Sequence, residues 1–236
     1  MKAIILAAGS GSRLRPLSDN KPKCLIEVRG KPILLHQIDM LNFAGFTEIE
    51  IITGYESQQI SSAVADLATC YEYPAFANTN NLYTLNYCGN LLQGEVIVMF
   101  ADVLLGGGAL EKLLEADGDF NLLVDMSQHL DDTMRIKLDN GFIIDIGGHI
   151  YPADGVFTGI AKYSAKGCKH LRNELATMVA AGGFESSYYT QALPRLVKTG
   201  QKISPVPIGK VPWIEVDTFL EYEQAIASDF YLINTA

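Results

Sequence analysis

Residues that could bind phosphate cluster in the stretch LAAGSGSRLRPL, which follows the first apolar run of the chain. Gly9 and Gly11 carry no Cβ, so backbone N–H groups beside them can approach anionic oxygens closely. The guanidinium of Arg13 can donate two hydrogen bonds to a terminal phosphate, and Lys23 offers a point charge for a second one. A phosphate site is therefore predicted, and a sharp turn with surface cations is the alternative.

Two better-known phosphate motifs do not fit this loop. A dinucleotide fingerprint and a P-loop both need a further glycine where the chain has Leu14, and the P-loop then needs Lys where it has Arg15. The four histidines fall in no triad or HExxH pattern, and the four cysteines form no CxxC pair. A dehydrogenase, a zinc site and a disulfide framework are therefore disfavoured.

The loop must follow a strand, and the first half of the chain alternates short apolar runs with helical patterns. The predicted elements are strands at 2–7, 48–53, 95–100 and near Tyr71, and helices at 32–44, 56–67 and 82–92. Such alternation is typical of a mainly parallel sheet with helices on both faces. A phosphate loop at the carboxyl end of the first strand suits that architecture.

The second half changes character. Asp139-Asn140-Gly141 between two apolar runs indicates a β-hairpin, because Asn and Gly tolerate positive φ. The predicted elements are strands at 133–138, 142–146, 156–161, 203–208 and 213–216, and helices at 164–182, 188–198 and 218–227. Pro194 is unfavourable inside the helix predicted at 188–198. Pro205 and Pro207 confine their predicted strand to a sheet edge. We therefore expect an α/β fold, a Rossmann-like mainly parallel mixed sheet with helices on both faces and a small antiparallel addition.

Composition limits the domains and partners. The chain has 236 residues, a formal net charge of −9 and 48% hydrophobic residues, which suits one domain over residues 1–236. The acidic balance argues against nucleic-acid binding. No apolar run approaches the ~18 residues of a membrane helix, so no membrane partner is expected. Unpaired cysteines and the lack of a signal-peptide pattern favour the cytoplasm.

Several segments together resemble one enzyme family. LAAGSGSRLRPLSDNKPKCL, Gly54-Tyr55, NNLYTL, Ala101-Asp102 and WIEVD occur in the order found in nucleotidyltransferases that join NTPs to phosphorylated sugars and alcohols. NNLYTL and WIEVD most resemble the small bacterial cytidylyltransferases acting on phosphocholine or phosphonates. The resemblance implies a single nucleotidyltransferase domain, with a nucleotide-binding half at 1–125 and an acceptor-binding, metal-completing half at 126–236.

The implied reaction is transfer of CMP from CTP to a small phosphonate or phosphoalcohol, such as 2-aminoethylphosphonate or phosphocholine, with Mg²⁺ and release of pyrophosphate. A phosphomonoester is largely ionised at neutral pH, since its second pKa lies near ~6, so no general base is needed. A sugar-1-phosphate nucleotidylyltransferase using another NTP is one alternative. A non-catalytic nucleotide-binding regulatory module is another, and a homodimer is left open.

The resemblance also assigns roles to residues. Arg13 and Lys23 would be catalytic, with Lys23 bridging the α-phosphate and the acceptor. Asp102, Asp217 and Glu215 would hold Mg²⁺, although either aspartate alone suits a helix cap equally well. The expected nucleotide-binding residues are Leu6, Ala8, Gly9, Ser10, Gly11, Ser12, Arg13, Lys23, Gly54 and Asn81.

A further set of residues could recognise the acceptor. Arg135 and Lys137 share one face of a predicted hairpin strand and could bind a phosphate oxygen, or could simply be solvated. Asp125 could meet an acceptor amine. Aromatic side chains could enclose a quaternary ammonium, although they usually pack in the core. The candidates are Tyr83, Asp125, Arg135, Lys137, Tyr189 and Trp213, with Tyr188 beside them.

Overall fold

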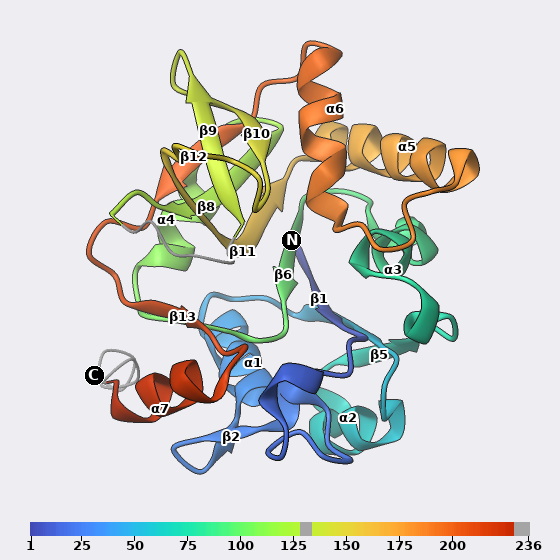
Figure 1. Cartoon of the computed structure of the whole chain (residues 1–236), viewed down its shortest axis with the longest axis vertical. Helices are drawn as coiled ribbons and strands as arrows, with labels where there is room; N and C mark the ends of the chain where they lie inside the picture. The colour runs from blue at the N-terminus through green and yellow to red at the C-terminus, as the bar shows by residue number, and fades with distance from the viewer. Residues whose placement is uncertain (128–133, 229–236) are drawn as a thin grey trace.

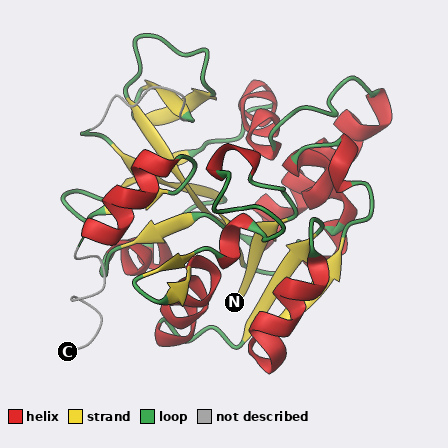
Figure 2. Cartoon of the chain, turned by 60° about the horizontal axis from the view of Figure 1, so that its bottom comes forward, coloured by secondary structure: helices red, strands yellow, loops and turns green. Residues whose placement is uncertain are grey.

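The computed structural model describes residues 1–127 and 134–228. Its main feature is a nine-stranded sheet in the order β10-β9-β11-β6-β1-β4-β5, with β8 pairing with β11 and β12 outside this path. Helices lie around the outside of the strands (Figures 1 and 2). The strands are β1 (Lys2–Ala7), β4 (Glu48–Thr53), β5 (Thr69–Glu72), β6 (Val96–Phe100), β8 (Phe120–Asp125), β9 (Arg135–Asp139), β10 (Phe142–Ile146), β11 (Gly155–Tyr163) and β12 (Ser204–Pro207).

The first half forms the parallel part of the sheet. Strand β1 pairs in parallel with β4 on one side and β6 on the other, which explains why its run KAIILA is apolar rather than alternating. Ala3, Ile4 and Ile5 are completely buried. The carboxyl ends of β1 and β6 therefore lie side by side, and the residues that follow them share one edge of the sheet.

The α-helices of the described residues follow the predicted order, with one exception. They are α1 (Ile33–Phe43), α2 (Ser57–Val64), α3 (Asn81–Tyr87), α4 (Ala109–Glu115), α5 (Ala165–Ala181), α6 (Ala192–Lys198) and α7 (Phe219–Ala227). Helix α4 is the exception, because no helix was predicted between 100 and 127. Pro194 lies in the first turn of α6, where no N–H partner is needed, so it does not break the helix.

Helix α3 is shorter than its apolar pattern suggested. It ends at Tyr87 and a 3₁₀ turn follows at Gly89–Leu91, before Leu92. Gly89 lies against the side chain of Arg172 in α5, where a Cβ would come within 3.3 Å of it. A glycine at this close approach weakens the helix, which accounts for the earlier end.

The antiparallel strands extend the same sheet. Strand β11 pairs antiparallel with β6, β8 and β9, so both halves of the chain share one sheet. The predicted hairpin is confirmed as β9 and β10, with positive φ at Asn140 and Gly141; the predicted residue 133 lies outside the described residues. Strand β12 is parallel to β8, its only partner among the described strands, as the prolines of β12 require. The expected α/β class, with a mixed sheet, is confirmed.

Two small two-stranded sheets lie where late segments of the chain contact early ones. Strand β13 (Trp213–Glu215) pairs antiparallel with β7 (Val103–Leu105), and β2 (Glu27–Val28) pairs with β3 (Lys31–Pro32). Helix α7 contacts β2 and β13, as Figure 1 shows at the lower left. A separate apolar cluster joins these segments. Its buried members are Leu14, Ile26, Val28, Ile33, Leu104, Val216 and Ala225.

No helix within the described ranges is both long enough and apolar enough to span a lipid bilayer.

Candidate active site

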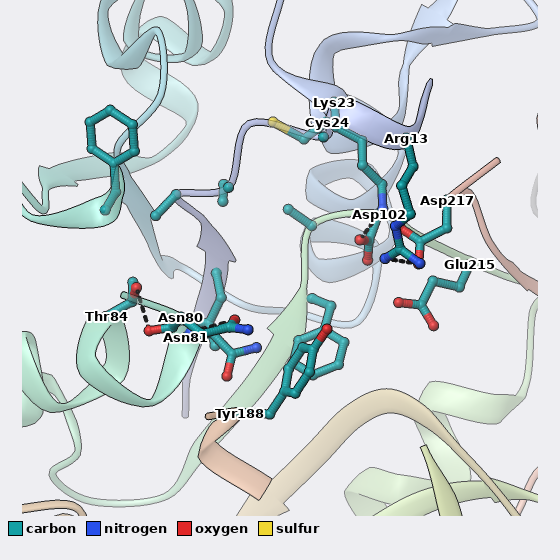
Figure 3. A pocket seen from close by; sticks show the side chains of 18 of the residues that line it. Arg13, Lys23, Cys24, Asn80, Asn81, Thr84, Asp102, Tyr188, Glu215 and Asp217 are labelled. Carbon is teal, nitrogen blue, oxygen red and sulfur yellow. Dashed lines mark hydrogen bonds and ion pairs between the residues drawn. The ribbon is translucent and has the colours of Figure 1, made fainter. Parts of the chain in front are cut away.

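A pocket of about 330 Å³ opens where the glycine loop leaves β1 (Figure 3). It receives side chains from both halves of the chain, because β13 and the turn after β6 come together there. Sequence-predicted residues that line it are Leu6, Ala8, Gly9, Gly11, Arg13, Lys23, Asn81, Asp102, Glu215 and Asp217. Tyr188, a candidate for the aromatic enclosure, also lines it. The remaining lining residues are Ala7, Cys24, Phe76, Thr79, Asn80, Thr84, Phe100, Ala101 and Met134.

The glycine loop is packed against the stem of Lys23. Gly11 has φ +61°, and a Cβ at this position would lie 2.5 Å from the Cβ of Lys23. The buried Ser18 hydroxyl donates to the Gly11 carbonyl at 2.8 Å. Only glycine meets both the left-handed backbone and the close approach. A Cβ on Gly9 would meet nothing within 4 Å, so that glycine leaves open space beside the backbone.

Lys23 connects two carboxylates from distant parts of the chain. Its Nζ donates to Asp102 at 2.6 Å and also to Asp217. Burial lowers the pKa of the Lys23 ammonium, but the charges of Asp102 and Asp217 and their hydrogen bonds outweigh burial and raise it above its ordinary value. The ammonium therefore stays charged at neutral pH.

Arg13 is the second cation at this end of the pocket. Its Nη2 donates to Asp217 at 2.7 Å, although 60% of its side chain is exposed. Figure 3 shows Arg13 and Lys23 approaching Asp217 together. The two cations that were predicted to bind phosphates therefore both contact the carboxylate of Asp217.

The turn that carries Asp102 is fixed by a buried amide. Gln37 of α1 donates from Nε2 to the carbonyls of Phe100 and Val103, each at 2.8 Å. The backbone N–H of Val216 donates to the Asp102 carbonyl at 2.9 Å. These bonds hold Asp102 from both sides and set it beside the segment that bears Asp217.

The helix-cap alternative for the two aspartates is wrong. Asp102 is followed by strand β7 rather than by a helix. Helix α7 is capped by Thr218, which forms a capping box with Glu221. Glu221 also accepts the backbone N–H of Asp217 at 2.8 Å. The side chain of Asp217 is therefore free of capping and points at Lys23 and Arg13.

Asp102, Glu215 and Asp217 form an acidic cluster, with one oxygen from each within 4.8 Å of the others. Burial, and then the charges of Asp102 and Asp217, raise the pKa of Glu215 to about 8. Oδ1 of Asp102 is buried and has no hydrogen-bond partner within the described residues. An unsatisfied carboxylate oxygen among like charges fits a hard divalent cation, for which carboxylates are preferred ligands.

The opposite end of the pocket carries amide groups. Asn80 caps α3, its Oδ1 accepting the backbone N–H of Asn81 at 2.7 Å. Oδ1 of Asn81 accepts the N–H of Tyr189 at 2.7 Å. Figure 3 shows both asparagines and Thr84 grouped away from the carboxylates. This end offers polar donors and acceptors but no charged side chain among its described residues.

Gly54 contributes indirectly. It does not line the pocket, but a Cβ there would lie 2.7 Å from Phe76 and 2.8 Å from the Ala8 carbonyl. The missing Cβ lets Phe76 approach the backbone of Ala8, and both of these residues line the pocket. Ser10 is not among the lining residues, and the side chain of Ser12 lies outside what the structure describes.

Apart from Tyr188, the predicted acceptor residues lie outside the pocket lining, and each has another partner. Asp125 accepts from the indole of Trp213 at 2.8 Å. Arg135 donates to the carbonyls of Gly148 and Ile150, and Lys137 pairs with Asp154 at 3.0 Å.

The expected aromatic enclosure is also not assembled in the pocket. Tyr189 is completely buried and packs edge-on against Phe100. Tyr83 donates to Glu185 at 3.1 Å. Of the aromatic candidates within the described residues, Tyr188 lines the pocket.

Sequence reasoning also missed Gln37 and Asn80. Gln37 interrupts the apolar face of α1, and a buried amide in that position was a signal for backbone contacts. Asn80 belongs to the NNLYTL segment that carried the family resemblance, and its position before α3 is typical of an N-cap.

Comparisons with known proteins bear on the family and the fold. The family model described as "Nucleotidyl transferase" matches residues 2–87. The chain is 26% identical over 252 residues to a CTP:phosphoglutamine cytidylyltransferase of Campylobacter jejuni, which covers 96% of this chain and 99% of that protein. It is 42% identical over 86 residues to a choline-phosphate cytidylyltransferase of Streptococcus pneumoniae, covering 36% and 38% of the two chains.

In sequence, a sugar-phosphate enzyme matches over a shorter length. A UTP–glucose-1-phosphate uridylyltransferase of Haloferax volcanii is 48% identical over 60 residues, covering 25% of each chain. Among solved structures, a CTP:phosphocholine cytidylyltransferase from Streptococcus pneumoniae has a TM-score of 0.81 at 23% identity, covering 96% of this chain and 97% of that one. A solved structure described as a "Putative Glucose-1-Phosphate Thymidylyltransferase" from Bacillus anthracis has a TM-score of 0.81 at 21% identity and covers 96% of this chain and 94% of that one. These two structural likenesses concern the fold, and together the matches confirm the resemblance seen in the sequence.

Proposed function

Since this chain is a nucleotidyltransferase, we propose that it transfers CMP from CTP to a small phosphorylated or phosphonate acceptor. One observation carries the proposal. The Nζ of Lys23 lies between Asp102 and Asp217, beside Arg13 and the glycine loop. Cations and carboxylates at one end of a pocket are what two negatively charged reactants need in order to meet.

The proposed reaction needs no general base. An ionised oxygen of the acceptor phosphate attacks the α-phosphorus of CTP, one P–O bond forms, and the bond to pyrophosphate breaks with its electron pair leaving on pyrophosphate. No proton has to be removed, because the acceptor oxygen is already largely ionised above a pKa of ~6. The groups that matter are therefore those that stabilise negative charge.

Lys23 and Arg13 are proposed as these groups. The backbone around Gly9 and Gly11 would bind the triphosphate, while Arg13 would bind an outer phosphate through its fork of N–H donors. Lys23 would leave its carboxylate partners in part and contact the α-phosphate as the bond forms. Its raised pKa keeps the charge that this role requires.

Asp102, Glu215 and Asp217 are the residues that would hold Mg²⁺. The fit rests on their proximity and on the unpartnered Oδ1 of Asp102. The ion would supply positive charge to phosphate oxygens when bound. Residues 1–125 would then supply the nucleotide site and Asp102, and residues 126–236 would complete the metal site and receive the acceptor.

Cytosine would occupy the amide end of the pocket. Asn80, Asn81 and Thr84 lie at that end (Figure 3), and amide and hydroxyl groups can bind the carbonyl and amino edges of a base. A relative that aligns with nearly the whole chain acts on CTP by its name, which supports CTP over the other nucleotides.

A sugar-1-phosphate nucleotidylyltransferase is the second candidate. It is favoured by the identity of 48% with a uridylyltransferase, although this extends over 60 residues. The site geometry on Lys23 and the carboxylates would serve either acceptor.

The deciding experiment pairs ATP, CTP, GTP and UTP with a panel of acceptors in the presence of Mg²⁺. The acceptors are phosphocholine, phosphoethanolamine, 2-aminoethylphosphonate and glucose 1-phosphate, and the measurement is pyrophosphate release with ³¹P NMR of the product. We expect turnover with CTP and a non-sugar acceptor. Turnover confined to glucose 1-phosphate would establish the second candidate, and CTP binding without turnover on any acceptor would indicate a non-catalytic module.

A further inference from the structure

A second hollow of about 440 Å³ adjoins the active-site pocket. The two share Met134 and Tyr188 as walls. The second hollow is bordered by the end of β10, by residues 147–149, by the end of α5 and by the start of α6. In Figure 3 Tyr188 lies on the side of the pocket that faces away from the glycine loop. The two hollows are therefore neighbours on either side of Met134 and Tyr188.

One side of the hollow is anionic. Asp145 lines it, with Oδ1 accepting the backbone N–H of Ile146 at 2.9 Å and Oδ2 lying 3.0 Å from Nε2 of His149. The Asp145 side chain is 40% exposed. An ionised carboxylate has about four lone-pair directions, so these contacts leave room for a ligand donor.

A guanidinium also lines the hollow. Arg195 of α6 uses Nε to contact Glu174 and lies 5.8 Å from the ring centre of Phe184. The guanidinium has five N–H donors in a planar fork, and its side chain is 45% exposed. Its outer N–H groups are suited to bind a carboxylate in two-pronged fashion.

Apolar side chains also line the hollow. Ile146 and Met178 are almost completely buried, and Phe184 and Pro194 add apolar surface, while His149, Ser186, Thr190 and Gln191 contribute polar groups. Such a lining can receive a short methylene chain, with charged groups at its sides. The charges distinguish three kinds of acceptor end. A quaternary ammonium is complementary in charge to Asp145 alone. A neutral sugar offers hydroxyl groups without a charge, and an amino acid is complementary in charge to both Asp145 and Arg195.

We propose that the second hollow binds the non-phosphorylated end of the acceptor, and that this end is a zwitterion with an ammonium for Asp145 and a carboxylate for Arg195. The inference rests on the proposed cytidylyltransferase function, because it takes the acceptor phosphate to lie at Lys23 and the carboxylate cluster. It goes beyond that function by naming the chemical class of the acceptor.

The test uses pairs of acceptors that differ by one carboxylate. O-phosphoserine is compared with phosphoethanolamine, and O-phosphohomoserine with 3-aminopropyl phosphate, each with CTP and Mg²⁺. At least one member bearing the carboxylate is expected to show a kcat/KM about tenfold or more above its partner, since a charge-assisted two-pronged contact is worth at least one factor of ten. Equal kcat/KM within both pairs would overturn the inference.

Variants assign the preference to the hollow. Arg195→Met is expected to abolish the preference through a raised KM for the carboxylate-bearing acceptor, with kcat little changed. Lys198→Met removes an exposed cation of the same helix that does not line the hollow, and it should keep the preference. Asp145→Asn should weaken both members of each pair equally. A preference that survives in Arg195→Met would refute the assignment.

The two proposals can fail separately. In one outcome, CTP releases pyrophosphate with phosphocholine or phosphoethanolamine while no acceptor pair shows a preference for the carboxylate. That result would support the cytidylyltransferase function and contradict the zwitterionic acceptor. If no acceptor gives turnover, calorimetry of the same pairs in the presence of CTP makes the comparison by binding. Equal affinity there would again count against the zwitterion.

Discussion

The indole N–H of Trp213 donates a hydrogen bond of 2.8 Å to the carboxylate of Asp125. The bond joins the end of β8 to the start of β13, within two residues of Glu215. Asp125 also accepts the backbone N–H and the hydroxyl of Ser127, at 2.8 and 2.7 Å. Burial alone would raise the pKa of Asp125, but these hydrogen bonds lower it below its ordinary value. Two residues predicted to bind the acceptor instead position the strand that carries part of the acidic cluster.

Trp213→Phe should therefore loosen the acidic cluster. The change keeps most of the ring packing but leaves Oδ2 of the buried Asp125 without its donor, at a cost of about 1–3 kcal/mol in the free energy of unfolding. Affinity for Mn²⁺ should fall as well, because Glu215 and Asp217 lose part of their support. Denaturant unfolding and Mn²⁺ titration followed by electron paramagnetic resonance measure both effects. Unchanged values in both would show that the bond does not position β13.

Lys23→Met should abolish most of the turnover. Removing one preorganised cation from a site that stabilises developing negative charge typically costs about 10²–10³ in kcat. Arg15→Met is the matched control, because Arg15 also lies in the segment between β1 and β2 but pairs with Asp19 on the surface. Pyrophosphate release measures both variants. Full activity in Lys23→Met, or an equal loss in the control, would contradict the proposed role.

The same substitution should have the opposite effect on metal binding in the absence of nucleotide. Lys23 lies between Asp102 and Asp217, where it competes electrostatically with a divalent cation. Its removal should therefore tighten binding of Mn²⁺, by an amount that shrinks as salt is added. Calorimetry gives the dissociation constant. Weaker binding in Lys23→Met would mean that the cluster is not the metal site.

Gln37→Met tests the amide beneath Asp102. Methionine has nearly the same shape but cannot donate to the carbonyls of Phe100 and Val103. We expect a loss of about 1–3 kcal/mol in the free energy of unfolding and a higher concentration of Mg²⁺ for half-maximal rate. Excess Mg²⁺ should restore most of kcat if Gln37 acts by positioning Asp102. A loss of kcat that saturating Mg²⁺ does not restore would point instead to misplacement of another group.

Gly11→Ala and Gly9→Ala separate packing from ligand approach. The backbone of Gly11 has φ +61°, and a Cβ there would lie 2.5 Å from Lys23. A Cβ on Gly9 would meet nothing within 4 Å. Gly11→Ala should lower stability by about 1 kcal/mol or more and reduce turnover. Gly9→Ala should leave thermal stability unchanged and weaken CTP binding. Equal stability of the two variants would contradict the packing argument.

Glu215 should make the metal-free protein sensitive to pH. Its pKa is about 8 when folded and near 4.5 ordinarily. Below pH ~4.5 Glu215 carries the proton in both the folded and the unfolded state, so the stability of the fold is then fully present. As the pH rises toward 8, Glu215 ionises in the unfolded state first. This favours the unfolded state, and the fold loses stability. The melting temperature in EDTA should thus fall from pH 5 to 8 more steeply than that of Glu215→Gln. Identical slopes would contradict the shift.

The sequence determined the local parts of this protein. Apolar runs placed β1, β4 and β6 within a residue of their observed ends, because a strand buried on both faces must be continuously apolar. The glycine loop, Arg13, Lys23 and the acidic candidates were identified from residue type and from the family resemblance. Asn140-Gly141 specified its hairpin, since that turn depends on two adjacent residues.

Tertiary structure decided which of these groups meet. Arg13 and Asp217 are 204 residues apart, and their contact depends on the pairing of β13 with β7 and on the apolar cluster beneath them. The same long-range packing buries Tyr189 and Trp213 and turns Arg135 toward carbonyls of its own hairpin region. Periodicity describes a residue's own element, whereas the partner of an exposed or buried side chain is selected by the packing of elements far away in the chain.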